Sequence, residues 1–162
     1  DHLDEVRKLC REANGTMLYA SNFSIGVNIL FEVNRHLARL MNHRQEYSVS
    51  IEETHHIHKK DAPSGTAITL AGGICDEMDG KDHWALTKPG MITDDERGVP
   101  ITSIRLGDAP GTHLVTYRSG NDELCLKHEA FGREGFAAGA VTAAEWIRGR
   151  HGFFTMKDLL QF

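Results

Sequence analysis

Residues 53–67 contain the side chains of this sequence that are best suited to chemistry: two adjacent histidines, His55 and His56, followed by Lys59. Imidazole titrates near neutral pH and can give or take a proton there. A lysine in a cationic cluster can also act as a proton donor near pH 7. These residue types in this order predict acid–base chemistry on a small substrate.

The same segment continues into a helix start that can bind an anion. Residues 61–65 read Asp-Ala-Pro-Ser-Gly, and Pro and Ser are typical of the first positions of a helix. The first turn of a helix carries unpaired N–H groups that attract carboxylates and phosphates, and the hydroxyls of Ser64 and Thr66 can add donors. With His56 and Lys59 close by, we predict a site for a small dianionic substrate.

The histidines and lysines also have plainer interpretations. His55 and His56 point to opposite faces of a predicted strand, and no carboxylate or thiolate partner stands at a fixed spacing, so we predict no metal site. A basic run such as 58–60 is usually solvated surface, and only the helix start that follows it favours a site. The remaining histidines are predicted at the surface or at the edge of the core: His2, His36, His43, His83, His113, His128 and His151.

Hydrophobic periodicity predicts the elements that position these groups. Residues 47–56 alternate as a half-buried strand whose odd-numbered positions share one face, and a helix follows at 66–78 after a short loop. The other predicted elements are, in chain order, a helix at 1–13, a strand at 16–20, a helix that includes 29–41, strand-like runs at 101–107, 112–118 and 123–130, and a helix at 135–148.

Three further expectations concern how these elements pair and pack. The last three strand-like runs should form an antiparallel meander, because a turn-like segment at 119–122 separates two of them. Residues 79–100 are polar and punctuated by Pro and Gly, and we predict little regular structure there. Gly139 should permit close packing of the final helix, and the apolar tail at 153–160 must dock on the rest of the chain.

Length and composition predict one domain with a proper core in 162 residues, of α/β class with α+β character, in which helices flank a mixed sheet. Three cysteines without C-x-x-C spacing fit a reducing compartment, by default the cytoplasm. The net charge of −5 argues against a nucleic-acid partner, and no apolar run reaches the roughly 18 residues that cross a membrane. Because the chain opens on Asp1, inside a predicted helix, we expect an excised piece of a longer protein.

Residues 53–67 resemble the signature of the dihydrodipicolinate reductases, also called 4-hydroxy-tetrahydrodipicolinate reductases: Glu-x-His-His-x-x-Lys-x-Asp-Ala-Pro-Ser-Gly-Thr-Ala. The flanking segments are similar as well. Residues 20–28 resemble the family's Asn-Phe-Ser-x-Gly-Val-Asn stretch, 103–113 its late strands and 136–146 its last long helix. The resemblance covers essentially the whole chain.

The resemblance implies a reaction and a role for each matched residue. The family reduces the ring of a cyclic substrate with two carboxylates, using hydride from NADPH or NADH, in the diaminopimelate route of lysine biosynthesis. Lys59 would be the proton donor and His55 the other acid–base residue. The substrate carboxylates would be held by His56, Ser64, Gly65 and Thr66. The cofactor contacts in this chain would be Ala20, Ser21, Asn22 and Phe23. Arg133 lies where the family has a Ser-Arg pair, although Gly132 precedes it here, which suggests a substrate role.

The resemblance also implies how the chain is divided. Residues 1–22 match the last α and β elements of a Rossmann-like dinucleotide-binding domain, 23–148 match the substrate-binding and tetramerisation domain, and 149–162 form a tail that returns to the first. The glycine-rich turn that holds the pyrophosphate of the cofactor is missing from this sequence. We therefore expect most of the cofactor site to lie outside the chain, and the chain to be inactive alone and to assemble as a homotetramer.

Two rival interpretations stay open. The first is a non-catalytic oligomerisation module that retains a dicarboxylate pocket. Every chemical position of the signature is intact, which favours the enzyme. The second, less favoured, is a metal protein built on the histidine cluster.

Overall fold

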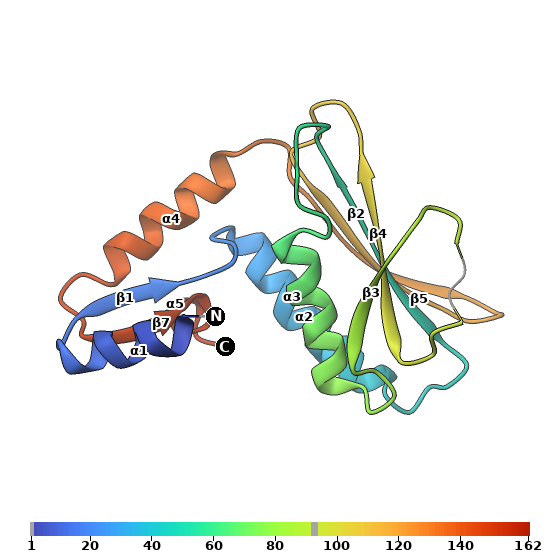
Figure 1. Cartoon of the computed structure of the whole chain (residues 1–162), viewed down its shortest axis with the longest axis horizontal. Helices are drawn as coiled ribbons and strands as arrows, with labels where there is room; N and C mark the ends of the chain where they lie inside the picture. The colour runs from blue at the N-terminus through green and yellow to red at the C-terminus, as the bar shows by residue number, and fades with distance from the viewer. Residues whose placement is uncertain (1, 92–93) are drawn as a thin grey trace. The chain divides into compact units, whose positions relative to one another are not determined.

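The computed structural model describes residues 2–91 and 94–162, which form two compact units (Figure 1). Unit 1 combines the segment that ends at Asn28 with the segment that begins at Glu134, and unit 2 is Ile29–Arg133. The long helix α2 (Ile25–Met41) begins in unit 1 and continues into unit 2. In the described part of the chain, no helix is both long and apolar enough to span a membrane.

Unit 2 is built on a five-stranded mixed sheet. Its strands, in spatial order, are β3 (His83–Thr87), β4 (Gly98–Arg105), β2 (Ser48–His55), β5 (Thr112–Arg118) and β6 (Glu123–Glu129). The central strand β2 pairs in parallel with β4 and antiparallel with β5. The carboxyl end of β2 therefore lies beside the carboxyl end of β4 and the amino end of β5.

One face of this sheet carries the core. In β2 the odd-numbered residues are buried and the even-numbered residues are exposed or half-exposed, as the alternation predicts. Helices α2 and α3 (Gly65–Glu77) lie on the buried face, and Figure 1 shows both on the same side of the sheet. The core residues are Leu30, Ala38 and Met41 of α2, Ala67, Leu70, Ala71 and Ile74 of α3, and Val49, Ile51, Val99, Ile101, Val115 and Tyr117 of the sheet. The predicted mixed sheet flanked by helices is confirmed.

Two predictions about the later strands are wrong. Residues 79–100 are not irregular throughout, because β3 and the start of β4 lie there. As an edge strand, β3 leaves most of its side chains exposed or half-exposed, so it lacks the apolar run that marks a central strand. The prediction of a three-stranded antiparallel meander is also wrong. The strand β2 lies between β4 and β5, and of the three predicted strands only β5 and β6 form a hairpin.

Unit 1 brings the two ends of the chain together. Its elements are α1 (Leu3–Glu12), β1 (Thr16–Tyr19), α4 (Glu134–Trp146), β7 (Gly152–Thr155) and α5 (Met156–Leu160). Strands β1 and β7 pair in parallel, so the apolar tail docks as predicted. Gly139 of α4 faces the carbonyl oxygen of Phe23 so closely that a Cβ there would collide with it, which confirms the predicted close packing.

Candidate functional site

A buried carboxylate, Glu53, lies where β2 meets the start of α3. Glu53 is fully buried and accepts hydrogen bonds from the backbone N–H of Ser64, at 3.1 Å to each carboxylate oxygen, and from Ser103 Oγ at 2.7 Å. In the register of the sheet, Glu53 is paired with Ser103 of β4 and with His113 of β5. The Glu53 side chain thus links three strands to Ser64, the residue just before α3.

Three basic groups surround this carboxylate. His55 Nδ1 lies 3.6 Å from Glu53 Oε2, His113 Nε2 lies 3.8 Å from the same oxygen, and Arg105 Nη1 lies 3.7 Å from Oε1. Burial by itself raises the pKa of Glu53, but the hydrogen bonds from Ser64 and Ser103 lower it more, so the net pKa lies below its usual value. Glu53 is consequently ionised at neutral pH and is the negative centre of a buried, hydrogen-bonded cluster.

The two imidazoles beside Glu53 are neutral at pH 7. The rings of His55 and His113 meet edge to face with centroids 5.1 Å apart. Burial lowers the pKa of His55, the charges of Lys59 and Arg105 lower it further, and the Glu53 carboxylate opposes them. Burial and the neighbouring His55 lower the pKa of His113 to about 4. A neutral imidazole has a lone pair that can accept a proton. Both rings are therefore in the form that proton exchange with a ligand requires.

Lys59 lies in the loop between β2 and α3, and Arg105 holds that loop in place. The Lys59 ammonium contacts both oxygens of Asp61 at 2.7 and 2.8 Å and thereby lowers the pKa of that carboxyl. The Arg105 guanidinium donates to the carbonyl oxygens of Lys59 and Asp61 at 3.3 and 2.6 Å. The lysine is therefore held on an ordered loop, next to the cluster around Glu53.

The first turn of α3 has the features of an anion site. Ser64 is the N-cap residue, and its hydroxyl oxygen accepts from the N–H of Ala67 at 3.2 Å and lies 3.1 Å from His113 Nε2. No other atom would lie within 4 Å of a Cβ added to the exposed Gly65. A ligand carboxylate can therefore approach the backbone at Gly65 and Thr66 without meeting a side chain.

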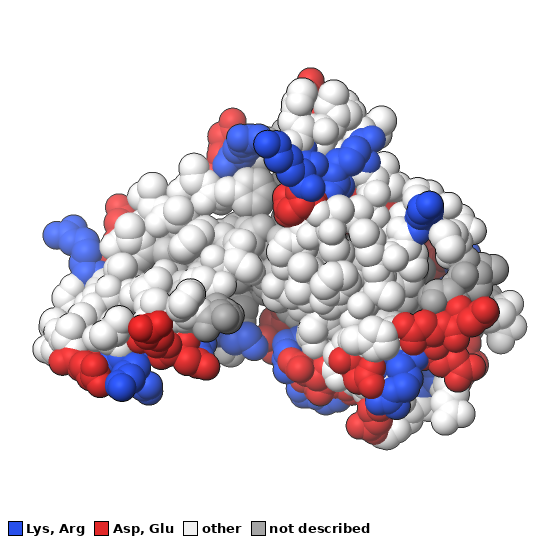
Figure 2. Space-filling view, viewed as in Figure 1, with Lys and Arg blue, Asp and Glu red and all other residues white. Residues whose placement is uncertain are grey.

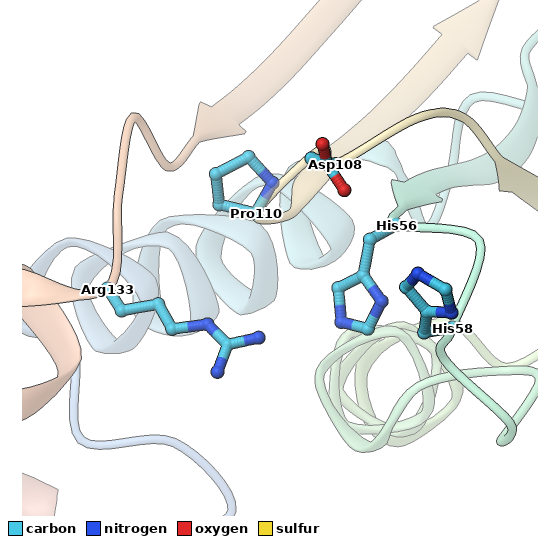
Figure 3. Close-up of a pocket in the computed structure, with 5 residues that line it drawn as sticks. All are labelled: His56, His58, Asp108, Pro110 and Arg133. Carbon is cyan, nitrogen blue, oxygen red and sulfur yellow. The ribbon is translucent and has the colours of Figure 1, made fainter.

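A pocket of about 240 Å³ opens at the same end of the sheet (Figure 3). It is lined by His56 and His58 from the β2–α3 loop, Asp108 and Pro110 from the β4–β5 loop, and Arg133 after β6. The Arg133 guanidinium extends toward the paired imidazoles of His56 and His58 in Figure 3. On the face shown in Figure 2, Lys and Arg side chains gather over this end of the sheet, which favours a negatively charged ligand.

The structure brings six of the predicted site residues together and places four others in unit 1. The six lie at the end of β2, in the following loop or at the start of α3: His55, His56, Lys59, Ser64, Gly65 and Thr66. The four are in the loop between β1 and α2: Ala20, Ser21, Asn22 and Phe23. In that loop Asn22 Oδ1 accepts from the N–H of Ser24 at 2.8 Å, and Asn28 donates to the Asn22 carbonyl at 2.9 Å.

Sequence reasoning missed three members of the cluster. Glu53 was part of the motif but had no predicted role, and Arg105 had none. His113 was predicted at the surface or at the edge of the core, which is wrong because its side chain is buried. His113 reaches the site because β5 is antiparallel to β2 in a register that pairs it with Glu53. The polar Glu53 and His113 on otherwise apolar strand faces were the available signal, but only the register shows that they meet.

Among the described residues, Glu53, His55 and His113 could together hold a metal ion, because their donor atoms lie within 4.8 Å of one another. The predicted absence of a metal overlooked this carboxylate, which is on the same strand as His55. However, Ser64 and Ser103 already donate to the Glu53 oxygens, and the Arg105 cation lies 3.7 Å away. These contacts disfavour a second cation in the cluster, and the absence of a metal stays a prediction.

Residues 26–160 match the family model described as "Dihydrodipicolinate reductase, C-terminus". The chain belongs to the dihydrodipicolinate reductase family. It is 46% identical over 160 residues to the 4-hydroxy-tetrahydrodipicolinate reductase of Christiangramia forsetii, a match that covers 99% of this chain and 65% of that protein. It is 39% identical over 149 residues to the reductase of Methanococcoides burtonii, covering 91% of this chain and 55% of that protein. The chain thus spans less than two thirds of the length of these relatives.

Among solved structures, this chain is similar to the dipicolinate-bound dihydrodipicolinate reductase from Paenisporosarcina sp. TG-14. The TM-score is 0.69 at 23% sequence identity, and the match covers 94% of this chain and 57% of that one. This likeness shows that the chain has the fold of the family.

Proposed function

We propose that this chain is the substrate-binding and oligomerisation portion of a reductase that converts 4-hydroxy-tetrahydrodipicolinate to tetrahydrodipicolinate with NADPH or NADH. The reaction belongs to the diaminopimelate route of lysine biosynthesis, and we expect it in the cytoplasm. The observation that carries the proposal is the grouping of acid–base residues, His55 and Lys59, with an anion site at the start of α3. Such a site suits a small ring with two carboxylates.

The two substrate carboxylates would bind to different groups. The backbone N–H groups of Gly65 and Thr66 and the Ser64 hydroxyl suit one carboxylate, because the helix dipole adds to their hydrogen bonds. His56 and Arg133 line the adjacent pocket and suit the other, since arginine binds carboxylates through two parallel hydrogen bonds. Holding both ends of the ring would fix the orientation of its reacting bond.

Reduction needs a hydride and a proton. NADPH or NADH supplies the hydride when bound, and Lys59 would supply the proton, with His55 as the second acid–base group beside it. Lys59 Nζ donates to both oxygens of Asp61, an exposed carboxylate that a substrate carboxylate could replace.

Part of the nicotinamide contact would come from the loop of Ala20, Ser21, Asn22 and Phe23. This loop follows the carboxyl end of β1, which is parallel to β7, and ligands of parallel sheets bind beyond the carboxyl ends of the strands. The loop thus fits a cofactor-binding role. The residues that hold the pyrophosphate would belong to a segment outside this sequence, with residues 1–22 and 149–162 as the part of the nucleotide-binding domain that this chain contains.

We also propose a homotetramer. The even-numbered residues of β2, among them Ser50 and Glu52, lie on the face of the sheet opposite the core, and Leu114 of β5 shares that face. In the described part of unit 2 no helix covers this face (Figure 1). Sheet faces from other subunits would cover it.

Calorimetry with dipicolinate, a planar dicarboxylate, tests the substrate site on this chain directly. We expect binding, no oxidation of NADPH or NADH by the chain alone, and at least a tenfold loss of affinity in His56→Ala and Arg133→Ala. His43→Ala, an exposed histidine away from the site, is the matched control. Failure to bind dipicolinate would reject the substrate site. Binding without NADPH or NADH oxidation by the full-length protein would instead favour the non-catalytic module.

A further inference from the structure

We propose that Glu53 is a positioning residue that sets the proton-bearing nitrogens of His55 and His113 and, through His113, leaves the Ser64 hydroxyl free to donate to a substrate carboxylate. This inference rests on the proposed function, because it assigns His55 to proton exchange and Ser64 to carboxylate binding. Beyond that function, it makes the buried charge of Glu53 the group that controls both His55 and Ser64.

The position of Glu53 in the sheet is the first reason. It belongs to a row of polar side chains on paired positions of four strands: Ser103, Glu53, His113 and His128. The residues at the next paired positions, Ile101, Ile51 and Val115, are apolar and buried. A buried carboxylate needs hydrogen bonds to offset the cost of its burial. Glu53 accepts them from Ser103 and from the backbone of Ser64, so the row connects the sheet to the start of α3.

The contacts of His55 are the second reason. Its buried Nδ1 has no hydrogen-bond partner among the described residues and faces the Glu53 carboxylate at 3.6 Å, so the contact is between a charge and the dipole of a neutral ring. Its Nε2 faces Gly111, where an added Cβ would lie only 3.1 Å from that nitrogen. The carboxylate favours a proton on Nδ1, which leaves the lone pair of Nε2 available on the side that Gly111 keeps open.

The contacts of His113 give the third reason. Its Nε2 lies 3.1 Å from Ser64 Oγ and 3.8 Å from the Glu53 carboxylate, whereas its buried Nδ1 has no hydrogen-bond partner among the described residues. The carboxylate favours a proton on the ring nitrogen that faces it, which is Nε2 in His113. His113 then donates to Ser64 Oγ.

The Ser64 hydroxyl consequently has a proton to offer. Its oxygen accepts from the N–H of Ala67 and from His113 Nε2, so its own O–H need not donate to His113. The Ser64 backbone N–H is already bound to Glu53, which fixes the orientation of the residue. Glu53 thereby prepares both the orientation and the hydrogen-bond direction of Ser64.

Glu53→Gln, which keeps the shape and removes the charge, tests this inference on the present chain. Glu52→Gln, on the exposed face of the same strand, is the matched control. Nitrogen-15 NMR of the histidine rings should show the Nδ1–H form of His55 and the Nε2–H form of His113 in the wild type and in Glu52→Gln, and mixed forms in Glu53→Gln. The titration of His55 should move at least about one pH unit lower in Glu53→Gln, because an opposite charge has been removed.

Several charged groups near the two rings affect the titration of His55 and His113. These groups are Glu53 of β2, Lys59 and Asp61 of the loop, Arg105 of β4, and His128 of β6 beside His113. Each of them except Glu53 is unchanged in Glu53→Gln, so a shift reports the carboxylate.

Dipicolinate affinity is the second readout, and we expect a loss of about tenfold or more in Glu53→Gln and none in Glu52→Gln. Glu53→Asp keeps the charge but has one methylene fewer, so its carboxylate lies farther from the two rings. It should keep the wild-type proton positions but not the full affinity. If Glu53→Gln does not fold, Glu53→Asp carries the test, and wild-type affinity in it would overturn the inference. Unchanged ring forms and affinity within twofold in a folded Glu53→Gln would do the same. Because the NMR readout needs no ligand, it tests Glu53 even if the chain fails to bind dipicolinate.

Discussion

At the scale of single residues, the site depends on how charges are distributed over three neighbouring strands. Glu53 is the negative centre, and Arg105, His55 and His113 surround it. Lys59 lies outside this centre and is paired with Asp61. The buried pairs fix geometry, while the exposed pair is free to exchange partners with a ligand.

Replacing Lys59 by alanine in the full-length reductase should lower kcat about 100-fold or more, because a positioned proton donor contributes that much to a reduction step. Lys60→Ala, the exposed neighbour, should change kcat little. Initial rates of NADPH oxidation measure both variants, and circular dichroism checks that they fold. Equal losses in the two variants would show that the basic run acts only through its overall charge.

His113 should make the folded protein sensitive to acid. Burial and His55 lower its pKa from 6.5 to about 4 in the folded state, so the unfolded chain binds more protons between these two pH values. The contribution of His113 is fully present above pH 6.5, and the free energy of unfolding falls by up to about 3 kcal/mol as the pH approaches 4. Burial also lowers the pKa of His55 and of His128, which act in the same direction.

Urea unfolding at about pH 7 and about pH 5 measures this dependence. His113→Gln should make the two free energies more nearly equal than in the wild type. His36→Gln, at an exposed position of α2, should keep the wild-type dependence. A wild-type pH dependence in His113→Gln would show that this imidazole is not the acid-sensitive group.

At the scale of elements, the strand β2, the loop after it and α3 were predictable from local sequence. The alternation of β2 and the Pro-Ser-Gly start of α3 are local signals, and the structure has both elements within one or two residues of the predicted bounds. The position of His113 was not predictable, because it depends on which strand pairs with β2 and in which register. Strand order is decided by contacts between distant segments, and no local pattern encodes it.

Gly139 tests the packing of α4 within unit 1. Gly139→Ala would push a methyl group against the carbonyl oxygen of Phe23, so it should destabilise the unit by about 1–3 kcal/mol through overpacking. Gly135→Ala, in the same helix with open space around it, should be neutral or stabilising by up to about 1 kcal/mol. Hydrogen exchange of the α4 amides distinguishes the two outcomes. Equal protection in both variants would contradict the close contact.

At the scale of the whole molecule, sequence alone identified the family and most of the elements, and it missed the edge strand β3 and the parallel pairing of β4. The strand β3 was missed because an edge strand carries no long apolar run, and the pairing of β4 was missed because β2 lies between β4 and β5, which follow each other in the sequence. The docking of the tail was predictable, since its phenylalanines are too apolar to be left in solvent, but its partner β1 was not.

The mass in solution tests the proposed assembly. Four chains of 18.0 kDa give about 72 kDa, which sedimentation velocity separates from a monomer. Leu114→Arg would place a charge on the uncovered face of the sheet and should shift the protein to smaller species. Met91→Arg, at an exposed position of the β3–β4 connection, should leave the mass unchanged. A wild-type monomer would reject the tetramer for this chain.

The pairing of β1 with β7 has a consequence for how the protein is made. The two strands come from opposite ends of the chain, whereas all strands of the larger sheet lie between residues 48 and 129. During synthesis, unit 2 can complete its sheet while residues 134–162 are still inside the ribosome. Unit 1 must wait for β7, so β1 leaves the ribosome without its partner. We expect the cluster around Glu53 to assemble before β1 and β7 pair.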